Sequence, residues 1–160
     1  MTKKKKKTGG HRILLRLVFL LYVAAMIWLL FGQRWGTDNH LEKTAAAINL
    51  TPFATVKLYW RVLTQSQDRD LLIHAFVNLA GNVVMFIPLG FYVPYLMEKV
   101  RNFFKAMLLL LVLILTVETV QYFTYLGSCD IDDVILNMAG VLIGYLIWWI
   151  AHPDLTSKTF

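Results

Sequence analysis

The stretch SCDIDDVILNMAGVLIG, residues 128–144, places three aspartates at the start of an otherwise apolar segment. The segment continues through an asparagine and two glycines, and it runs to about residue 151 without another charged side chain. An apolar run of this length is typical of a transmembrane helix, which needs about 20 residues to cross the hydrocarbon core. The acidic start is therefore the feature that sets this segment apart from an ordinary membrane anchor.

The composition of the whole chain indicates a membrane protein. Of its 160 residues 58% are hydrophobic and 16% are charged, whereas soluble domains are about half apolar and one quarter charged. Apolar segments at about residues 13–31, 75–97, 104–126 and 131–151 are long enough, or nearly so, to span a bilayer. The sequence predicts an all-α integral membrane protein, with one four-helix membrane domain over residues 13–151.

The distribution of basic residues predicts how the spans are oriented. Of the 16 lysines and arginines, 11 lie in short stretches that share one side, including the run from Lys3 to Lys7. By the positive-inside rule both terminal tails, residues 1–12 and 152–160, are expected in the cytoplasm, and the loop of residues 32–74 outside. The lysine run is interpreted as a topological signal, so no nucleic-acid partner is expected.

The predicted outer loop contains one further element. Apolar and aromatic side chains recur at helical spacing over residues 53–65, with Lys57 and Arg61 beside them. Aromatic and basic residues on such a helix favour the headgroup layer, so we predict an extracytoplasmic helix that lies on the membrane surface. The preceding NLTPF, residues 49–53, is expected to lead into this helix in an extended or turned conformation because of its proline.

Each of the last three spans carries polar residues on one face. A helix advances 100° per residue, so side chains three or four positions apart share a face. The stripes contain His74, Asn78 and Asn82 in the second span, Glu118, Gln121 and Tyr122 in the third, and Asp133 and Asn137 in the fourth. The short turn at residues 127–130 makes the third and fourth spans antiparallel neighbours, so Glu118 is expected to reach Asn137. We predict a polar cleft that opens to the exterior.

The carboxylates define the chemistry of that cleft. Ionisable groups inside spans are costly and usually face protein or a wet cavity. Asp130, Asp132 and Asp133 are expected at the rim, where they are candidate ligands for Mg²⁺ or Ca²⁺, and Glu118 at the floor is a candidate general base. The same polar residues could instead join the helices by hydrogen bonds, and the glycines at 140 and 144 are spaced for close helix contact.

In combination these segments resemble a known family. NLTPF, NLAGNVVMFIPLGF, ETVQ and DIDDVILNMAGVLIG occur in this order along essentially the whole chain, and the combination resembles the VanZ family of bacterial membrane proteins. The resemblance is carried by Asn78, Asn82, Phe86, Pro88, Gly90, Glu118, Gln121, Asp130, Asp133, Asn137 and Gly140. It implies a place in the bacterial cytoplasmic membrane and an association with low-level teicoplanin resistance.

Three functions stay open at this point. The first is the binding of a lipid, a lipid-linked cell-wall precursor or a lipoglycopeptide in the polar cleft. The candidate binding residues are Asn78, Asn82, Glu118, Gln121, Tyr122, Asp130, Asp133, Asn137, Lys57 and Arg61. The second is a membrane enzyme that modifies a lipid headgroup, with Glu118 as base and an aspartate-bound divalent cation. The third is a small channel or transporter, which would require an oligomer.

Overall fold

The structure is a computed structural model that describes residues 8–32, 48–124, 126–127 and 129–156. The chain divides into two compact units, residues 1–36 and 37–160. The first contains α1 (Thr8–Phe31), which is apolar from Ile13 onward except for Arg16 and is long enough to cross a membrane. The lysine run of residues 3–7, residues 33–47 of the expected outer loop and the last four residues lie outside the described part of the chain.

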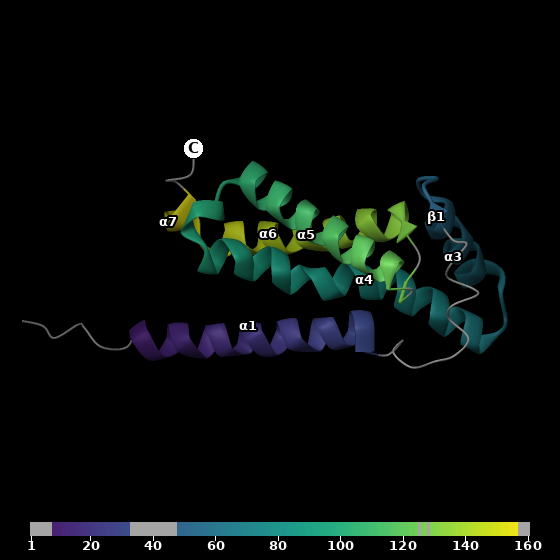
Figure 1. Cartoon of the computed structure of the whole chain (residues 1–160), viewed down its shortest axis with the longest axis horizontal. Helices are drawn as coiled ribbons and strands as arrows, with labels where there is room; N and C mark the ends of the chain where they lie inside the picture. The colour runs from purple at the N-terminus through teal and green to yellow at the C-terminus, as the bar shows by residue number, and fades with distance from the viewer. Residues whose placement is uncertain (1–7, 33–47, 125, 128, 157–160) are drawn as a thin grey trace, which may run out of the picture. The chain divides into compact units, whose positions relative to one another are not determined.

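The second unit contains the remaining elements (Figure 1). In chain order they are β1 (Ile48–Asn49), α3 (Ala54–Gln65), α4 (Arg69–Leu96), the 3₁₀ helix η2 (Glu98–Val100), α5 (Phe103–Phe123), β2 (Cys129–Asp130), α6 (Ile131–Ala151) and α7 (Pro153–Thr156). Helices α4, α5 and α6 contact one another along the bundle. Helix α3 lies at the end where α6 begins, and α7 lies at the other end (Figure 1).

The expected fold class is confirmed. Four helices are long and apolar enough to cross a membrane, and a short helix lies between the first and the second. The protein is therefore a multi-pass membrane protein. The described part of the chain also contains the parallel pair β1–β2, two residues long in each strand, which the sequence did not predict.

Two helix boundaries differ from the predicted ones for local reasons. Helix α4 begins at Arg69, not near residue 75, because the Asp68 side chain accepts the backbone N–H groups of Asp70 and Leu71 and caps the helix. Helix α5 ends at Phe123, not residue 126, because the N–H groups of residues 126 and 127 both turn back to the carbonyl oxygen of Gln121. The third span, α5, is consequently shorter than the second, α4, with 21 residues against 28.

Glycines allow α4 and α6 to pack with their backbones in contact. A side chain at Gly140 would collide with the carbonyl oxygen of Val83, and one at Gly144 with that of Ile87. The relationship is mutual, because a side chain at Gly90 of α4 would collide with the carbonyl oxygen of Val141. Small residues at these positions let two membrane helices approach closely, as the spacing of the α6 glycines predicted.

Helix α5 packs on α6 through one stripe of buried side chains. The stripe consists of Ala106, Leu110, Ile114, Glu118 and Gln121, spaced by four, four, four and three residues. The Phe103 ring at the start of α5 lies edge-on to the Tyr145 ring near the end of α6, with 5.4 Å between ring centroids. The two helices are therefore antiparallel neighbours, as expected.

Candidate functional site

The carboxylate of Asp132 caps helix α3 from the first turn of α6. Asp132 is fully buried, and it accepts hydrogen bonds from the backbone N–H groups of Phe53, Thr55 and Val56. The first N–H groups of a helix have no partner within the helix and carry a partial positive charge, so a carboxylate placed there is stabilised. In α3 the cap comes from a different helix, not from the residue that precedes it.

Asp130 makes a second connection between the same two helices. Its carboxylate accepts hydrogen bonds from the Thr55 hydroxyl and from the side-chain amide of Asn49, the latter at 3.3 Å. It also accepts the backbone N–H of Asp132 at 2.9 Å and so caps α6. Beside it, Asn49 pairs with Asp130 in the parallel pair β1–β2. We refer to Asp130 and Asp132 with these partners as the aspartate anchor.

The anchor holds an unfavourable backbone conformation in place. Phe53 has φ 63° and ψ 13°, in the left-handed region that side chains other than glycine seldom adopt. Its N–H donates to Asp132, and the turn that it ends includes Pro52, with the Ala54 N–H bonded to the Thr51 carbonyl at 3.3 Å. Of the two conformations expected for residues 49–53, extended or turned, the structure has the turn, and its left-handed residue is bonded to α6.

Helices α4 and α6 are joined by a polar contact one residue beyond the anchor. The Asn82 side-chain amide donates to the Asp133 carboxylate at 2.6 Å. Asn78 lies one turn before Asn82 on α4, and Asn137 lies one turn after Asp133 on α6, each on the same face as its neighbour. We refer to Asn78, Asn82, Asp133 and Asn137 as the polar cluster.

Asn78 and Asn137, on either side of the Asn82–Asp133 hydrogen bond, each have a side-chain oxygen that could accept a further hydrogen bond. Asn137 is only 2% exposed, and its side-chain oxygen has no hydrogen-bond partner within the described part of the chain. The buried side-chain oxygen of Asn78 likewise has none among the described residues. A buried polar atom without a partner costs about 1–3 kcal/mol. Two such atoms therefore flank the Asn82–Asp133 hydrogen bond.

Glu118 and Gln121 are both buried on α5, on the stripe that faces α6. Glu118 is fifteen residues after Phe103, and Asp130 is fifteen residues before Tyr145, the residue that Phe103 contacts. With the same rise of about 1.5 Å per residue in each helix, Glu118 comes level with the first turn of α6. This register favours Asp133 over Asn137 as its neighbour. Tyr122 is half-buried, and its ring lies edge-on to that of Phe123.

The exposed face of α3 is basic and aromatic. Lys57 and Arg61, one turn apart, are exposed, as are Leu58 and Trp60, the latter at 64%. The other face contacts α4, where the Tyr59 ring lies 5.9 Å from the ring of His74. Lys57 and Arg61 thus share one helix with the capped N-terminus of the aspartate anchor.

The acidic residues do not form a metal site in the described residues. No three His, Cys, Asp or Glu side chains gather there in an arrangement that could hold an ion. Asp130 and Asp132 instead have backbone, amide and hydroxyl donors as partners. The suggestion that these aspartates ligate Mg²⁺ or Ca²⁺ therefore gains no support from their geometry.

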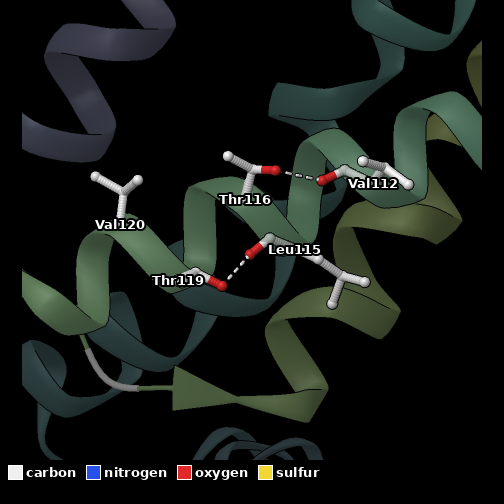
Figure 2. Close-up of a pocket in the computed structure, with 5 residues that line it drawn as sticks. All are labelled: Val112, Leu115, Thr116, Thr119 and Val120. Atoms are coloured by element: carbon white, nitrogen blue, oxygen red, sulfur yellow. Dashed lines mark hydrogen bonds between the residues drawn. The ribbon is translucent and has the colours of Figure 1, made fainter.

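A shallow groove on α5 has a different character. Val112, Leu115, Thr116, Thr119 and Val120 line it (Figure 2). The hydroxyls of Thr116 and Thr119 donate to the carbonyl oxygens of Val112 and Leu115, at 2.7 and 2.6 Å. Each hydroxyl proton is thus used within the helix, so the groove presents mostly methyl groups and suits an acyl chain better than a headgroup.

Sequence reasoning missed the partners of the anchor. It identified Asp130, Asp132 and Asp133 but placed all three at the rim of one cleft, whereas two of them connect to α3. Asn49 and Thr55 were not singled out, because nothing in the local sequence indicates a contact with a residue about 75 positions away. The one signal was the position of Asp130 directly before a helix, where a capping residue is expected.

Comparisons with known proteins match nearly the whole chain. The sequence matches the VanZ/LLP1 family over residues 16–152. It is 27% identical to Protein VanZ from Enterococcus faecium over 148 residues. This aligned region covers 92% of this chain and 81% of that protein. No solved structure matches the chain. The matched span includes the aspartate anchor, the polar cluster and α5.

Proposed function

The chain belongs to the VanZ/LLP1 family, and we propose that it binds the polar headgroup of a membrane amphiphile at the α3 end of its spans. The amphiphile is a lipid, a lipid-linked cell-wall precursor or a lipoglycopeptide. The polar cluster receives the headgroup, and the acyl chain stays in the surrounding leaflet. VanZ is associated with low-level teicoplanin resistance, and we propose that this binding is the basis of that association.

One observation carries the proposal. Two buried side-chain oxygens, on Asn78 and Asn137, have no partner among the described residues, and they flank the Asn82–Asp133 hydrogen bond. Polar residues that only join helices gain stability from their mutual hydrogen bonds, about 0.6 kcal/mol each on average. A side-chain oxygen that makes no such bond does not contribute in this way, so its burial between two membrane helices supports a ligand as its partner.

The position of α3 supports an amphiphile as that ligand. Trp60, Lys57 and Arg61 are exposed on a helix held against the first turn of α6. Such side chains favour the layer of lipid headgroups, and basic ones attract phosphate. With the orientation that the positive-inside rule predicts, this end faces the cell exterior and the outer leaflet. Teicoplanin carries an acyl chain, and its cell-wall target is lipid-linked, so both are amphiphiles at that surface.

The test is teicoplanin susceptibility of a susceptible bacterial host that expresses the chain. Wild type is expected to lower susceptibility, and Asp133→Asn to abolish the effect, because the variant removes the charge of the polar cluster. Asp70→Asn is the matched control, since Asp70 is an exposed carboxylate in the first turn of α4. Equal protection by Asp133→Asn and wild type, at equal membrane levels, would refute the proposal.

Lipid analysis of the same strains separates binding from catalysis. A binding protein leaves the set of lipid species unchanged, whereas an enzyme with Glu118 as general base yields a modified headgroup that Glu118→Gln abolishes. Glu98→Gln is the matched control, because Glu98 is exposed in η2 and its ion-pair partner among the described residues is Arg101. A new lipid species that requires Glu118 would replace the binding proposal with the enzymatic one.

A further inference from the structure

We propose that the exposed face of α3 binds the headgroup of a lipid whose phosphate carries two negative charges, such as a terminal phosphate. Lys57 and Arg61 supply the two positive charges. This surface shares no residue with the polar cluster, so its binding of a phosphate does not depend on the proposed function. It favours doubly charged phosphates over the singly charged phosphodiesters of common phospholipids.

The apolar side of α3 packs on protein, so a basic strip remains outside. Tyr59 and Leu63 are half-buried, and the Tyr59 ring lies 5.9 Å from the ring of His74 on α4. Lys57 and Arg61 are each two positions from Tyr59, so at 100° per residue they point about 160° away from it. A helix that entered a membrane by its apolar side would expose Tyr59 and Leu63 instead. The face that α3 offers to a partner is therefore the basic one.

The two charges of this face are not neutralised within the described part of the chain. Lys57 and Arg61 are exposed and have no ion-pair partner there. Residues 48–67 contain no aspartate or glutamate. Asp130 and Asp132 reach the N-terminus of α3, but their carboxylates accept hydrogen bonds from its backbone and from the Thr55 hydroxyl. A partner of opposite charge is therefore the one that this face fits.

The other charged residues at this end of the bundle belong to the start of α4. Asp68, Arg69 and Asp70 are exposed there, and the Asp68 carboxylate caps the helix. Helix α4 contacts the side of α3 that carries Tyr59, which is opposite to Lys57. These carboxylates consequently do not share a face with the basic strip.

The spacing of the two cations suits one headgroup. Lys57 and Arg61 are one turn apart, which places their Cβ atoms about 5–6 Å from each other. Arginine can bind a phosphate through two N–H groups, and lysine adds a point charge. A terminal phosphate carries about 1.5–2 negative charges at neutral pH. Attraction to the charged surface of a whole bilayer typically uses clusters of about 4–8 basic residues. Two neighbouring cations therefore match a single doubly charged phosphate better.

Apolar side chains on both sides of the cations favour a lipid over free phosphate. Leu58 and Trp60 are 58% and 64% exposed. Leu58 lies three positions before Arg61, and Trp60 lies three positions after Lys57, so each is a surface neighbour of one cation. Tryptophan favours the headgroup layer of a membrane. A phosphate that is attached to a hydrocarbon chain can contact both parts of this surface.

The test measures lipid binding to the purified full chain in detergent by native mass spectrometry, at about pH 8, where a terminal phosphate is fully ionised. Dioctanoyl phosphatidic acid, phosphatidylglycerol and phosphatidylcholine share their acyl chains, and their phosphates carry two charges, one charge and a compensating cation. We expect phosphatidic acid to bind at least about tenfold more tightly than phosphatidylglycerol, the effect of one further charge-assisted hydrogen bond. Phosphatidylcholine is expected to bind least.

The same measurement can contradict each part of the proposal. Equal binding of phosphatidic acid and phosphatidylglycerol would overturn the preference for a doubly charged phosphate. Displacement of phosphatidic acid by about a tenfold excess of inorganic phosphate would overturn the lipid as the ligand. Binding of none of the three lipids would overturn the surface as a binding site. All of these outcomes leave the proposed function standing, because that function is tested at Asp133.

Variants show whether α3 makes the distinction. The double variant Lys57→Gln/Arg61→Gln is expected to bind phosphatidic acid about tenfold more weakly and to lose its preference over phosphatidylglycerol. It should fold normally, because both side chains are exposed and have no ion pair among the described residues. Thermal unfolding in detergent checks this.

The matched control is Lys99→Gln/Lys105→Gln. It removes the same charge from exposed residues at the other end of the bundle, where the Tyr145 hydroxyl of α6 donates to the carbonyl oxygen of Arg101. The control should retain the preference for phosphatidic acid. An equal loss in both double variants would show attraction by net charge alone and would overturn the assignment to α3.

Discussion

The carboxylate of Asp132 accepts the backbone N–H of Thr55 at 2.8 Å, although the two residues are 77 positions apart. A helix that lies between two spans is thereby fixed to the first turn of the last span. Its partner Asp130 adds a contact to the Thr55 hydroxyl, so both connections reach the same residue of α3. The contact sets where the basic face of α3 lies with respect to the polar cluster.

We first predict that Asp132→Asn releases α3. The substitution removes a buried charge and one acceptor from a helix N-terminus, at a cost of roughly 2 kcal/mol. Cys129 reports the release, because it is the only cysteine of the chain and its strand pairs with Ile48 just before α3. The rate at which a maleimide labels Cys129 in the purified protein is expected to rise.

The control for that prediction is Asp70→Asn, which changes an exposed carboxylate in the first turn of α4. Its labelling rate should equal that of the wild type. An unchanged rate in Asp132→Asn would show that α3 is held by other contacts, such as its packing on α4.

A second prediction concerns two glycines of the same helix. Gly90→Ala places a methyl group on the carbonyl oxygen of Val141, which cannot move without separating α4 from α6. We expect a loss of about 1–3 kcal/mol and a lower midpoint of thermal unfolding in detergent. At Gly81 the same change meets only the Val77 side chain at 4.0 Å. Gly81→Ala should leave the midpoint unchanged or raise it, because alanine favours helix. Equal midpoints for the two variants would contradict the close packing.

The groove on α5 gives a third prediction. Thr116 and Thr119 are exposed, and their hydroxyls donate within the helix, so Thr116→Val and Thr119→Val remove no contact between helices (Figure 2). We expect stability within about 0.5 kcal/mol of the wild type and unchanged teicoplanin susceptibility. Loss of protection in either variant, with normal membrane levels, would place a ligand contact on this face of α5.

Local and periodic features of the fold could be predicted from the sequence. The spans follow from apolar length, and a close helix contact at Gly140 and Gly144 follows from their spacing, although the spacing does not identify α4 as the partner. The start of α4 depended on a side-chain cap, and the end of α5 on backbone hydrogen bonds to Gln121. Asp68 extends α4 by about two turns beyond its apolar part, and no hydropathy pattern marks such an extension.

The candidate site was predictable only in part. Helical spacing correctly put Asn78 with Asn82 and Asp133 with Asn137 on shared faces, and the Asn82–Asp133 bond joins the two pairs. The roles of Asp130 and Asp132 were not predictable, because they depend on donors from α3 about 75 residues earlier in the chain. Adjacent residues on a helix point about 100° apart, so Asp132 contacts α3 whereas Asp133 contacts Asn82 of α4.

The last prediction separates a ligand contact from a structural one within the polar cluster. Asn137→Leu removes a buried amide whose oxygen has no partner among the described residues, so the variant should unfold at the same temperature as the wild type or higher. Asn82→Leu removes the donor to Asp133 and leaves that carboxylate without it, so this variant should be less stable by about 1–3 kcal/mol. Protection against teicoplanin should be lost in both. Thermal unfolding in detergent and susceptibility of the expressing host provide the two measurements. A stable Asn137→Leu variant that protects as well as the wild type would show that Asn137 does not contact the ligand, since leucine has the same branched side-chain shape as asparagine but offers no acceptor.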